Sequence, residues 1–240
     1  MKAVILAGGK GRRLAPYTTT LPKPLLPVGE MPILEILLIQ LKFFGIKDIS
    51  LCVGYLGSLI QAYFGKGERY GMNIEYSFEN QPLGTAGPLK LVEGLSEPFL
   101  VMNGDLLTTI NFRGLIDYHF QHGEKATISL AERHVKLDFG VIEYDQDGNL
   151  IDYKEKPVTR FFVSMGVYVF HPAVLNFIER GTKLDLPDLI LNLKRAGTVV
   201  KTYIPACQWL DIGRPEDYEE ANRMMDKDKR VFLRDTVRES

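Results

Sequence analysis

Near its N-terminus the chain reads Leu6-Ala7-Gly8-Gly9-Lys10-Gly11-Arg12-Arg13-Leu14, and Pro22-Lys23-Pro24 follows. The apolar run from Ala3 to Leu6 predicts a buried strand that ends in this glycine-rich loop. The glycines let the backbone approach a ligand, and the N–H groups of such a loop can bind phosphate oxygens. Arg13 and Lys23 would neutralise charge that backbone amides offset only in part. The stretch therefore predicts a nucleotide-binding loop after the first strand.

This loop differs from the two best-known glycine-rich phosphate loops. It lacks the Gly-Lys-Ser/Thr ending of a Walker loop and the three-glycine spacing of a Rossmann fingerprint. A glycine turn after a first strand can also be turn chemistry alone. Its function therefore depends on the side chains that the rest of the chain brings to it.

Length and charge set bounds on the kind of protein. The 240 residues suffice for one domain with a large core, predicted over 1–225, and the charged stretch 226–240 predicts a helix end and a solvated tail. Lys and Arg number 29 and Asp and Glu number 30, a net charge of −1, so no overall field favours nucleic acid or a membrane as a partner. No apolar run reaches transmembrane length. Any anion site must be local.

The cysteines, the histidines and the N-terminus suggest no special chemistry. Cys52 and Cys207 both lie in apolar runs, so we expect reduced core residues. The histidines show neither metal-ligand spacing nor a neighbouring nucleophile motif, and we expect surface or capping roles for all four of them, at positions 119, 122, 134 and 171. Met1 leads directly into the first predicted strand without a cleavable leader, so we expect a cytoplasmic protein.

Strand and helix signals alternate through the first half, which predicts a mostly parallel sheet with helices on its faces. Beyond Ala126 strands dominate, with a hairpin signal at Asp147-Gly148. The expected fold is α/β, with a β-rich half inserted before the last helices. Strands are predicted at 3–6, 48–54, 73–78, 98–102, 127–131, 139–144, 150–154, 164–170 and 198–204, and helices at 32–44, 55–64, 87–95, 172–179, 186–195 and from 215.

Two aspartates follow predicted strands at widely separated points of the chain. Asp105 comes just after the apolar run Phe99 to Met102, and Asp211 follows Trp209-Leu210. The carboxyl ends of strands in open α/β sheets are where ligands bind. If both strand ends meet at one edge, the two carboxylates could share Mg²⁺, which takes one or two carboxylates plus phosphate oxygens and water. The alternative is two unrelated turn residues.

The whole N-terminal string, with Pro16, Thr18 and Pro22-Lys-Pro-Leu25, resembles the signature of the sugar-1-phosphate nucleotidylyltransferases. Asn103-Gly-Asp105 and Trp209-Leu-Asp211 resemble the metal-bearing segments of that family. Gly140-Val-Ile-Glu143, Glu155-Lys156-Pro157 and Gly166 are similar to the segments that hold its sugar phosphate. The resemblance covers residues 1 to about 222. Arg12 departs from it, because the family most often has a small hydroxyl residue there, and we expect Arg12 to face water.

The resemblance implies a Rossmann-like α/β/α sandwich whose inserted half binds the sugar. It also implies the reaction of an NTP with a sugar 1-phosphate to give an NDP-sugar and pyrophosphate, with Mg²⁺, and a possible homo-oligomer. Arg13 is expected at the triphosphate, Lys23 at the α-phosphate and Lys156 at the sugar phosphate. The other expected nucleotide-binding residues are Leu6, Ala7, Gly8, Gly9, Gly11, Glu79, Gly84, Thr85 and Asp105, and the other sugar-phosphate-binding residues are Gly140, Glu155 and Gly166.

Glu79 and Thr85 are the candidates for binding the base. A carboxylate at Glu79 could accept from the two donors of guanine, N1–H and N2–H₂, or from the single N3–H of uracil or thymine. The form Pro82-Leu-Gly-Thr-Ala-Gly-Pro88 is more similar to guanylyltransferases for mannose, heptose or related sugar phosphates. GTP is therefore the expected nucleotide, with uridylyl, thymidylyl and cytidylyl transfer as alternatives. Thr85 could instead be only a helix N-cap and Glu79 only a charge at a strand end.

Two other classes of protein are less consistent with the sequence. A non-catalytic sensor of nucleotide sugars predicts loss of Arg13, Lys23 or an aspartate, and all are present. A glycosyltransferase on a similar fold would need an Asp-x-Asp metal motif after the central strand, which Asn103-Gly-Asp105 does not supply. No covalent nucleophile is needed for in-line nucleotidyl transfer, because that reaction depends on positioning and charge neutralisation.

Overall fold

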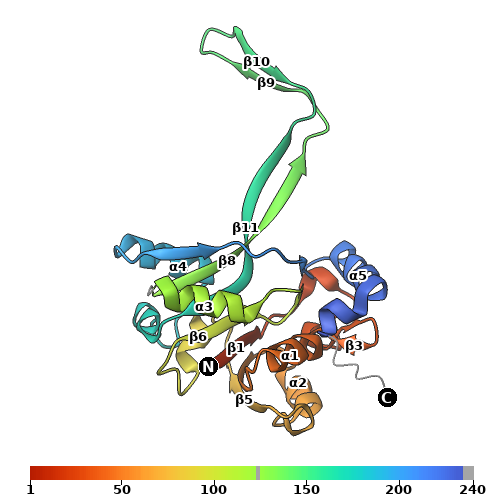
Figure 1. Cartoon of the computed structure of the whole chain (residues 1–240), viewed down its shortest axis with the longest axis vertical. Helices are drawn as coiled ribbons and strands as arrows, with labels where there is room; N and C mark the ends of the chain where they lie inside the picture. Colours follow the sequence, from red (N-terminus) through yellow and green to blue (C-terminus); the bar gives the residue numbers. More distant parts are fainter. Residues whose placement is uncertain (123–124, 235–240) are drawn as a thin grey trace.

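The structure of the chain is a computed structural model, and it describes residues 1–122 and 125–234. Over these residues the body is a seven-stranded sheet with helices on both faces, and a long two-stranded arm projects from it (Figure 1). The strand order is β12 (Val200–Tyr203), β8 (Ala126–Lys136), β11 (Val158–Phe170), β6 (Phe99–Asn103), β1 (Lys2–Ala7), β4 (Asp48–Val53) and β5 (Asn73–Phe78). The predicted α/β class, with a mostly parallel sheet, is confirmed.

The sheet is parallel except at β11, which runs antiparallel to both β6 and β8. Successive side chains of β1 point to opposite faces of the sheet, so they belong to two different core clusters. Ala3, Ile5 and Ala7 point to the face covered by α1 (Ile33–Phe43), α2 (Gly57–Phe64) and α3 (Phe112–His122). Val4 belongs to the opposite face, where α4 (Leu186–Arg195) packs. These near-continuous apolar strands are typical of a sheet that is covered on both faces.

A third apolar cluster joins the two ends of the chain. It packs α5 (Pro215–Leu233) against α1 and against the short strands beside them, which are β2 (Pro27–Val28), β3 (Met31–Pro32), β7 (Leu106–Thr108) and β13 (Trp209–Asp211). Beyond the predicted tail boundary at residue 226 the chain is kinked at Asp228 and then helical again to Leu233, and Phe232 is fully buried. That part of the prediction was wrong, because Phe232, although it follows a highly charged run, has a core site. Residues 235–240 lie outside the described residues.

Two predicted helices and one predicted core cysteine differ from expectation in the structure. The helix predicted at 87–95 is only a 3₁₀ segment, Gly87–Leu91, since the backbone N–H groups of Ala86 and Gly87 both donate to the carbonyl of Leu184. The helix predicted at 172–179 is likewise a 3₁₀ segment, Pro172–Phe177. Cys52 is buried as expected, but Cys207 is only half-buried. None of the helices in the described ranges has both the length and the apolar character needed to cross a bilayer.

The histidines divide between expected and unexpected roles. The ring of His171 caps the 3₁₀ segment by accepting from the N–H of Ala173, and His122 and His134 are exposed. His119 was predicted at the surface but is 2% exposed, and its Nδ1 lies 2.9 Å from Oγ1 of Thr127. The prediction failed there because the apolar face of α3 turns His119 onto the sheet, where a buried hydroxyl pairs with it.

The arm comprises residues 131–163, the outer parts of β8 and β11 and the hairpin of β9 (Val141–Tyr144) and β10 (Leu150–Lys154). The β8–β11 ladder continues from the body to the pair Val158 and Lys136. Its register shifts between Ser164 and Tyr168, at the point where the arm leaves the body. Figure 1 shows the β9–β10 hairpin at the far end of the arm. The predicted Asp147-Gly148 turn joins these two strands.

Candidate functional site

The loop after β1 uses its glycines in three different ways. Gly11 adopts φ 60°, and the Oγ1 of Thr18 donates to its carbonyl at 2.8 Å. A Cβ at Gly8 would stand 2.1 Å from Oε1 of Glu79, so Gly8 makes room for that carboxylate. Around Gly9 nothing lies within 4 Å of the Cβ position. Gly9 is therefore the position of these three where the backbone itself faces open space.

Lys23 is placed by a single 3₁₀ turn, Lys23–Leu25, that follows extended Pro22. The residue is only 9% exposed, and its ammonium forms an ion pair with the carboxylate of Asp105, 82 residues away in the chain. A buried lysine requires such a partner because desolvation disfavours an isolated charge. The segment Pro22-Lys23-Pro24 is thus joined directly to the segment that carries Asp105.

Asp211 lies beside Asp105 because of the β7–β13 ladder. Asp211 pairs with Leu106 in that ladder, and the N–H of Ile212 donates to the carbonyl of Asp105 at 3.1 Å. Burial, and then the charge of Asp105, raises the pKa of Asp211, while Lys23 and Arg13 act in the opposite direction. The β7–β13 ladder thus places the two aspartates side by side, which is the arrangement that a shared cation would require.

The same carboxylates fit a divalent cation. Oδ1 of Asp105 is buried and has no hydrogen-bond partner, which leaves a lone pair free for a ligand. In the described ranges no group of three or more His, Cys, Asp or Glu residues could hold a metal ion. A cation here would therefore have two protein carboxylates and would take its other oxygens from water and substrate, as Mg²⁺ commonly does.

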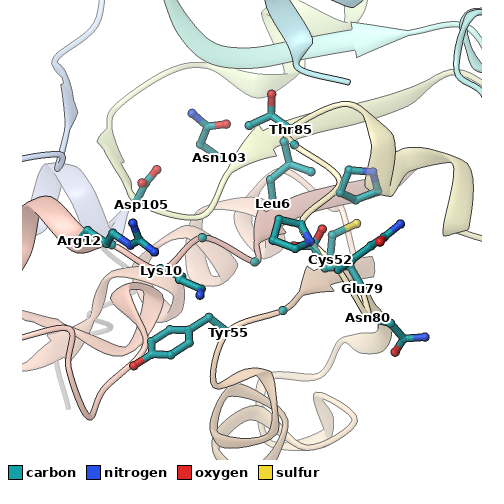
Figure 2. A pocket seen from close by; sticks show the side chains of 18 residues that line it. Leu6, Lys10, Arg12, Cys52, Tyr55, Glu79, Asn80, Thr85, Asn103 and Asp105 are labelled. Carbon is teal, nitrogen blue, oxygen red and sulfur yellow. The ribbon is translucent and has the colours of Figure 1, made fainter. Parts of the chain in front are cut away.

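Two pockets meet at this point. The larger, of about 850 Å³, extends from Asp105 along the glycine loop to Glu79 and Asn80. The smaller, of about 280 Å³, is lined by Arg13, Lys23, Gly213 and others. Residues common to both are Leu6, Gly9, Gly11, Arg12 and Asp105. Figure 2 shows Asp105, Arg12 and Lys10 at one end of the larger pocket and Glu79 with Asn80 at the other. One end of the site therefore carries two cations and a carboxylate, and the other carries the carboxylate of Glu79 and the amide of Asn80.

Glu79 is held at the far end by backbone contacts. Its Oε2 accepts from the N–H of Leu83 at 2.9 Å, and its Oε1 lies in the space left by Gly8 and Gly54. Gly84, with φ 77°, lies so close to the carbonyl of Leu184 that a Cβ would be 2.5 Å from its oxygen. Both residues line the larger pocket.

Thr85 lines the pocket too, but its hydroxyl is already used. The N–H of Leu186, the first residue of α4, donates to Thr85 Oγ1 at 2.7 Å. The Thr85 N–H donates to Oδ1 of Asp185 at 3.0 Å. The structure therefore supports the capping interpretation of this side chain, with the cap supplied from a distant part of the chain.

The predicted sugar-phosphate residues are divided between the body and the arm. A Cβ at Gly166 would stand 2.6 Å from Nδ2 of Asn103, a pocket residue, so Gly166 lies at the site. Gly140, Glu155 and Lys156 line neither pocket. Glu155 accepts from the Tyr153 hydroxyl at 2.9 Å, and Gly140 leaves room for both side chains. The structure does not bring these three arm residues to the chain's own site.

Several pocket residues were missed by sequence reasoning, and four of them carry polar or charged side chains close to the loop or to a strand end. Arg12, expected to face water, is exposed but lines both pockets, and Lys10, Tyr55 and Asn103 line the larger one. Arg12 and Lys10 stand inside the quoted loop, so their charge was the available signal. Tyr55 and Asn103 follow or end strands β4 and β6, and that position is the signal for ligand contact.

Comparison with protein families places this geometry in context. A family model described as nucleotidyl transferase matches residues 2–228. The chain is 34% identical to a UTP–glucose-1-phosphate uridylyltransferase of Synechocystis, over 93% of this chain and 63% of the relative. It is 37% identical to a mannose-1-phosphate guanyltransferase of Candida albicans, over 91% of this chain and 62% of the relative. The chain thus spans less than two thirds of the length of these relatives.

Solved structures show the same fold. A protein assigned as a glucose-1-phosphate thymidylyltransferase from Bacillus anthracis, crystallised with sucrose, superposes with a TM-score of 0.75 and 26% identity, over 93% of this chain and 94% of that chain. HddC from Yersinia pseudotuberculosis, in complex with GMP-PN, superposes with a TM-score of 0.72 and 25% identity, over 93% and 99% of the two chains.

Proposed function

This chain belongs to the sugar-1-phosphate nucleotidyltransferase family, and we propose that it transfers a nucleotidyl group from an NTP to a sugar 1-phosphate, giving an NDP-sugar and pyrophosphate. The observation that carries the proposal is the junction of two pockets at Asp105, with Lys23, Arg13 and Arg12 around it. The larger pocket has the volume of a nucleotide site, since small-molecule sites occupy about 300–1,000 Å³. The smaller, cation-lined pocket suits a polyphosphate.

The proposed chemistry is an in-line displacement at the α-phosphorus. An oxygen of the sugar phosphate forms a bond to that phosphorus, while the bond from the α-phosphorus to the bridging oxygen breaks and pyrophosphate leaves. Lys23 neutralises charge at the α-phosphate, and Arg13 binds the leaving pyrophosphate. Positioning and charge neutralisation are what such a transfer needs from a protein, so the reaction requires no covalent nucleophile.

We propose Mg²⁺ as the cation held by Asp105 and Asp211. It would neutralise phosphate charge and help to hold two anions side by side. The unpartnered Oδ1 of Asp105 and the raised pKa of Asp211 support this assignment, because a bound cation compensates both. We further propose a cytoplasmic location and a homo-oligomeric state.

GTP is the proposed nucleotide, with mannose, heptose or a related sugar 1-phosphate as acceptor. Glu79 lies at the end of the pocket opposite the cations, where a base would sit if its phosphates lie at Asp105 (Figure 2). Its carboxylate can accept from N1–H and N2–H₂ of guanine. Guanyltransferases are among the similar proteins, and uridylyl and thymidylyl enzymes are as well, so the choice of base needs its own test.

The test offers the protein each NTP with a panel of sugar 1-phosphates and Mg²⁺ and measures pyrophosphate release. The proposal expects release that requires both substrates, with the highest kcat/KM for GTP. No release with any pair would contradict the transferase function, and a preference for UTP would overturn only the choice of base.

A second experiment addresses Glu79 directly. ITP has the N1–H of GTP but lacks its 2-amino group, so the wild type should prefer GTP by about tenfold or more, since hydrogen bonds to charged groups contribute about 1.5–3 kcal/mol. Glu79→Gln should lower that GTP/ITP ratio toward one. An unchanged ratio in the variant would mean that Glu79 does not contact the base.

A further inference from the structure

The wall of the larger pocket around Glu79 is a loop without helix or strand. It comprises residues 79–86, between the end of β5 and the 3₁₀ segment Gly87–Leu91. Backbone N–H groups in such a loop have no ladder of their own, so its conformation depends on the acceptors that other segments supply. The residues of this loop that line the pocket are Glu79, Asn80, Gln81, Pro82, Gly84 and Thr85.

The segment 181–186, which leads into α4, supplies several of those partners. The N–H of Leu184 donates to the carbonyl of Leu83 at 3.0 Å. The carbonyl of Leu184 in turn accepts from the N–H groups of Ala86 at 2.9 Å and of Gly87 at 3.1 Å. The pocket wall is therefore docked by its backbone onto a segment that lies about a hundred residues further along the chain.

The two segments approach each other too closely for side chains between them. A Cβ at Gly84 would stand 2.5 Å from the carbonyl oxygen of Leu184 and 2.6 Å from Oδ1 of Asp185. A Cβ at Gly87 would stand 2.8 Å from the carbonyl oxygen of Thr182. Glycine at these two positions is what permits the contact, so the position of one segment determines the position of the other.

Asp185 makes an unusual contact across this junction. It occupies the N-cap position of α4, where an aspartate commonly accepts from the helix's own N–H groups, but its side chain caps nothing in α4. Its Oδ1 accepts instead from the N–H of Thr85 at 3.0 Å and lies 3.4 Å from Thr85 Oγ1. The Thr85 hydroxyl accepts from the N–H of Leu186 at 2.7 Å. The cap of α4 and the pocket wall are thus stabilised by the same pair of side chains.

The same contacts extend to Glu79. The N–H of Leu83 donates to Oε2 of Glu79 at 2.9 Å, while the Leu83 carbonyl is held by Leu184. Thr85 is two residues further along the loop. Among the bonds described above that cross from the segment 181–186, only that of Asp185 has an ionised partner, and such bonds are about twice as strong as neutral ones. Loss of the Asp185 carboxylate should therefore loosen the wall on which Glu79 lies.

Asp185 itself lines neither pocket, whereas Thr85 lines the larger one (Figure 2). Any effect of Asp185 on a ligand must therefore act through Thr85 and the loop around it. We propose that Asp185 is a positioning residue for the nucleotide, and that its bond to Thr85 holds the loop 79–86 in the conformation that accepts the base. This inference rests on the proposed function, which places the base at this end of the pocket.

The proposal has a specific kinetic consequence. Without the carboxylate of Asp185, the loop is in the binding conformation for a smaller fraction of the time, and the apparent affinity for the nucleotide falls by that fraction. Saturating nucleotide selects the binding conformation again, so turnover at saturation is retained. A role in stability alone would instead lower the amount of active protein and leave KM unchanged.

Steady-state kinetics with the NTP that the wild type prefers test this split. Asp185→Ala should raise the KM for that NTP about tenfold, the effect of losing one hydrogen bond to a charged group. Its kcat and its KM for the sugar 1-phosphate should be unchanged. Asp185→Asn keeps an acceptor oxygen and should restore most of the affinity. Asp188→Ala, at an exposed position in the first turn of α4, is the matched control and should behave as the wild type.

Two results would overturn the positioning role. One is a wild-type KM for the NTP in Asp185→Ala, and the other is an Asp185→Asn protein as impaired as Asp185→Ala. Urea unfolding curves of all three variants show whether each is folded at the assay temperature, so that a loss of active protein is not read as a loss of affinity.

Calorimetric titration decides the same question without turnover. The NTP and inorganic pyrophosphate are each titrated with Mg²⁺ and without sugar phosphate. Asp185→Ala should weaken binding of the NTP and leave binding of pyrophosphate unchanged, because pyrophosphate reaches only the end of the site that carries the cations. Equal weakening of both, or of neither, would overturn the proposal. A wild type that binds the NTP but releases no pyrophosphate with any sugar 1-phosphate would contradict the proposed function, and the titrations would still decide the role of Asp185.

Discussion

The charges at the centre of the site neutralise one another. Lys23 is paired with Asp105, and Asp211 lies beside both with its pKa raised, chiefly by burial. Two carboxylates in one half-buried place disfavour each other's charge, and the neighbouring cations compensate only in part. A substrate with several phosphates would therefore enter a site where Lys23 and Arg13 already lie close to the carboxylates of Asp105 and Asp211.

Lys23→Ala should lower turnover about 100-fold or more, by analogy with the loss of one charge-stabilising donor at a reacting centre. The exposed Lys42→Ala on α1 is the matched control and should leave turnover unchanged. Steady-state pyrophosphate release and a urea unfolding curve are measured for both. Wild-type turnover in a folded Lys23→Ala protein would exclude Lys23 from the chemistry.

His119 should make stability depend on pH. Burial, and then the nearby His171, lowers the pKa of His119 from its ordinary value of 6.5. The folded protein then binds fewer protons than the unfolded chain below that value, so the free energy of unfolding falls as pH drops from about 6.5 through the lowered pKa. His119→Gln should show a smaller loss between pH 7.5 and 5.5.

Urea titrations at the two pH values measure this difference. The exposed His122→Gln on the same helix serves as the control and should keep the wild-type slope. Equal pH dependence in the wild type and His119→Gln would place the acid sensitivity elsewhere.

At the scale of elements, the cap of α4 ties the larger pocket to the far face of the sheet. Thr85 supplies its hydroxyl to the N–H of Leu186 across 101 residues of sequence. Thr85→Ala should therefore cost about 1 kcal/mol of unfolding free energy, whereas Thr85→Ser should retain the cap. Chemical denaturation compares the two. If Ala and Ser are equally stable, the hydroxyl is not acting as a cap.

The elements of the body could be predicted well because their signals are local. The predicted strand 73–78 and the predicted helix 186–195 coincide with β5 and α4, and Lys23 and Asp105 do meet. The separate functions of the glycines could not be predicted. Gly8 is needed because Glu79 lies against it, and that contact exists only after β4 and β5 have brought two distant loops together.

At the largest scale, α5 packs the C-terminal part of the described chain against α1 and the short strands beside it. Phe232 is fully buried in the third apolar cluster, and its carbonyl accepts from Nε2 of the buried Gln40 at 2.7 Å. Phe232→Ala should lower the free energy of unfolding by about 3–5 kcal/mol, the usual cost of removing a buried aromatic ring. Val231→Ala, at a 36% exposed neighbour, should change it by less than about 0.5 kcal/mol. Comparable losses in the two variants would contradict this packing.

The arm shows the limit of sequence reasoning at this scale. Strands at 127–131, 139–144, 150–154 and 164–170 were predicted, but their signals did not reveal that β8 extends to Lys136 and that β11 begins at Val158. A run of alternating apolar and polar residues has the same sequence pattern whether its strand lies within a sheet or projects from it. The prediction of Lys156 at the sugar phosphate stays a prediction, because the structure places Lys156 on the arm and outside the lining of both pockets.

The central claim is that two phosphates meet at Asp105 and exchange a nucleotidyl group. The direct measurement follows GTP labelled at the α-phosphate during turnover with mannose 1-phosphate and Mg²⁺. Labelled GDP-sugar and unlabelled pyrophosphate should form in equal amounts, and neither should form without the sugar phosphate. If the label appears as GMP or GDP at a rate that does not depend on the sugar phosphate, the protein hydrolyses GTP and does not transfer the nucleotidyl group.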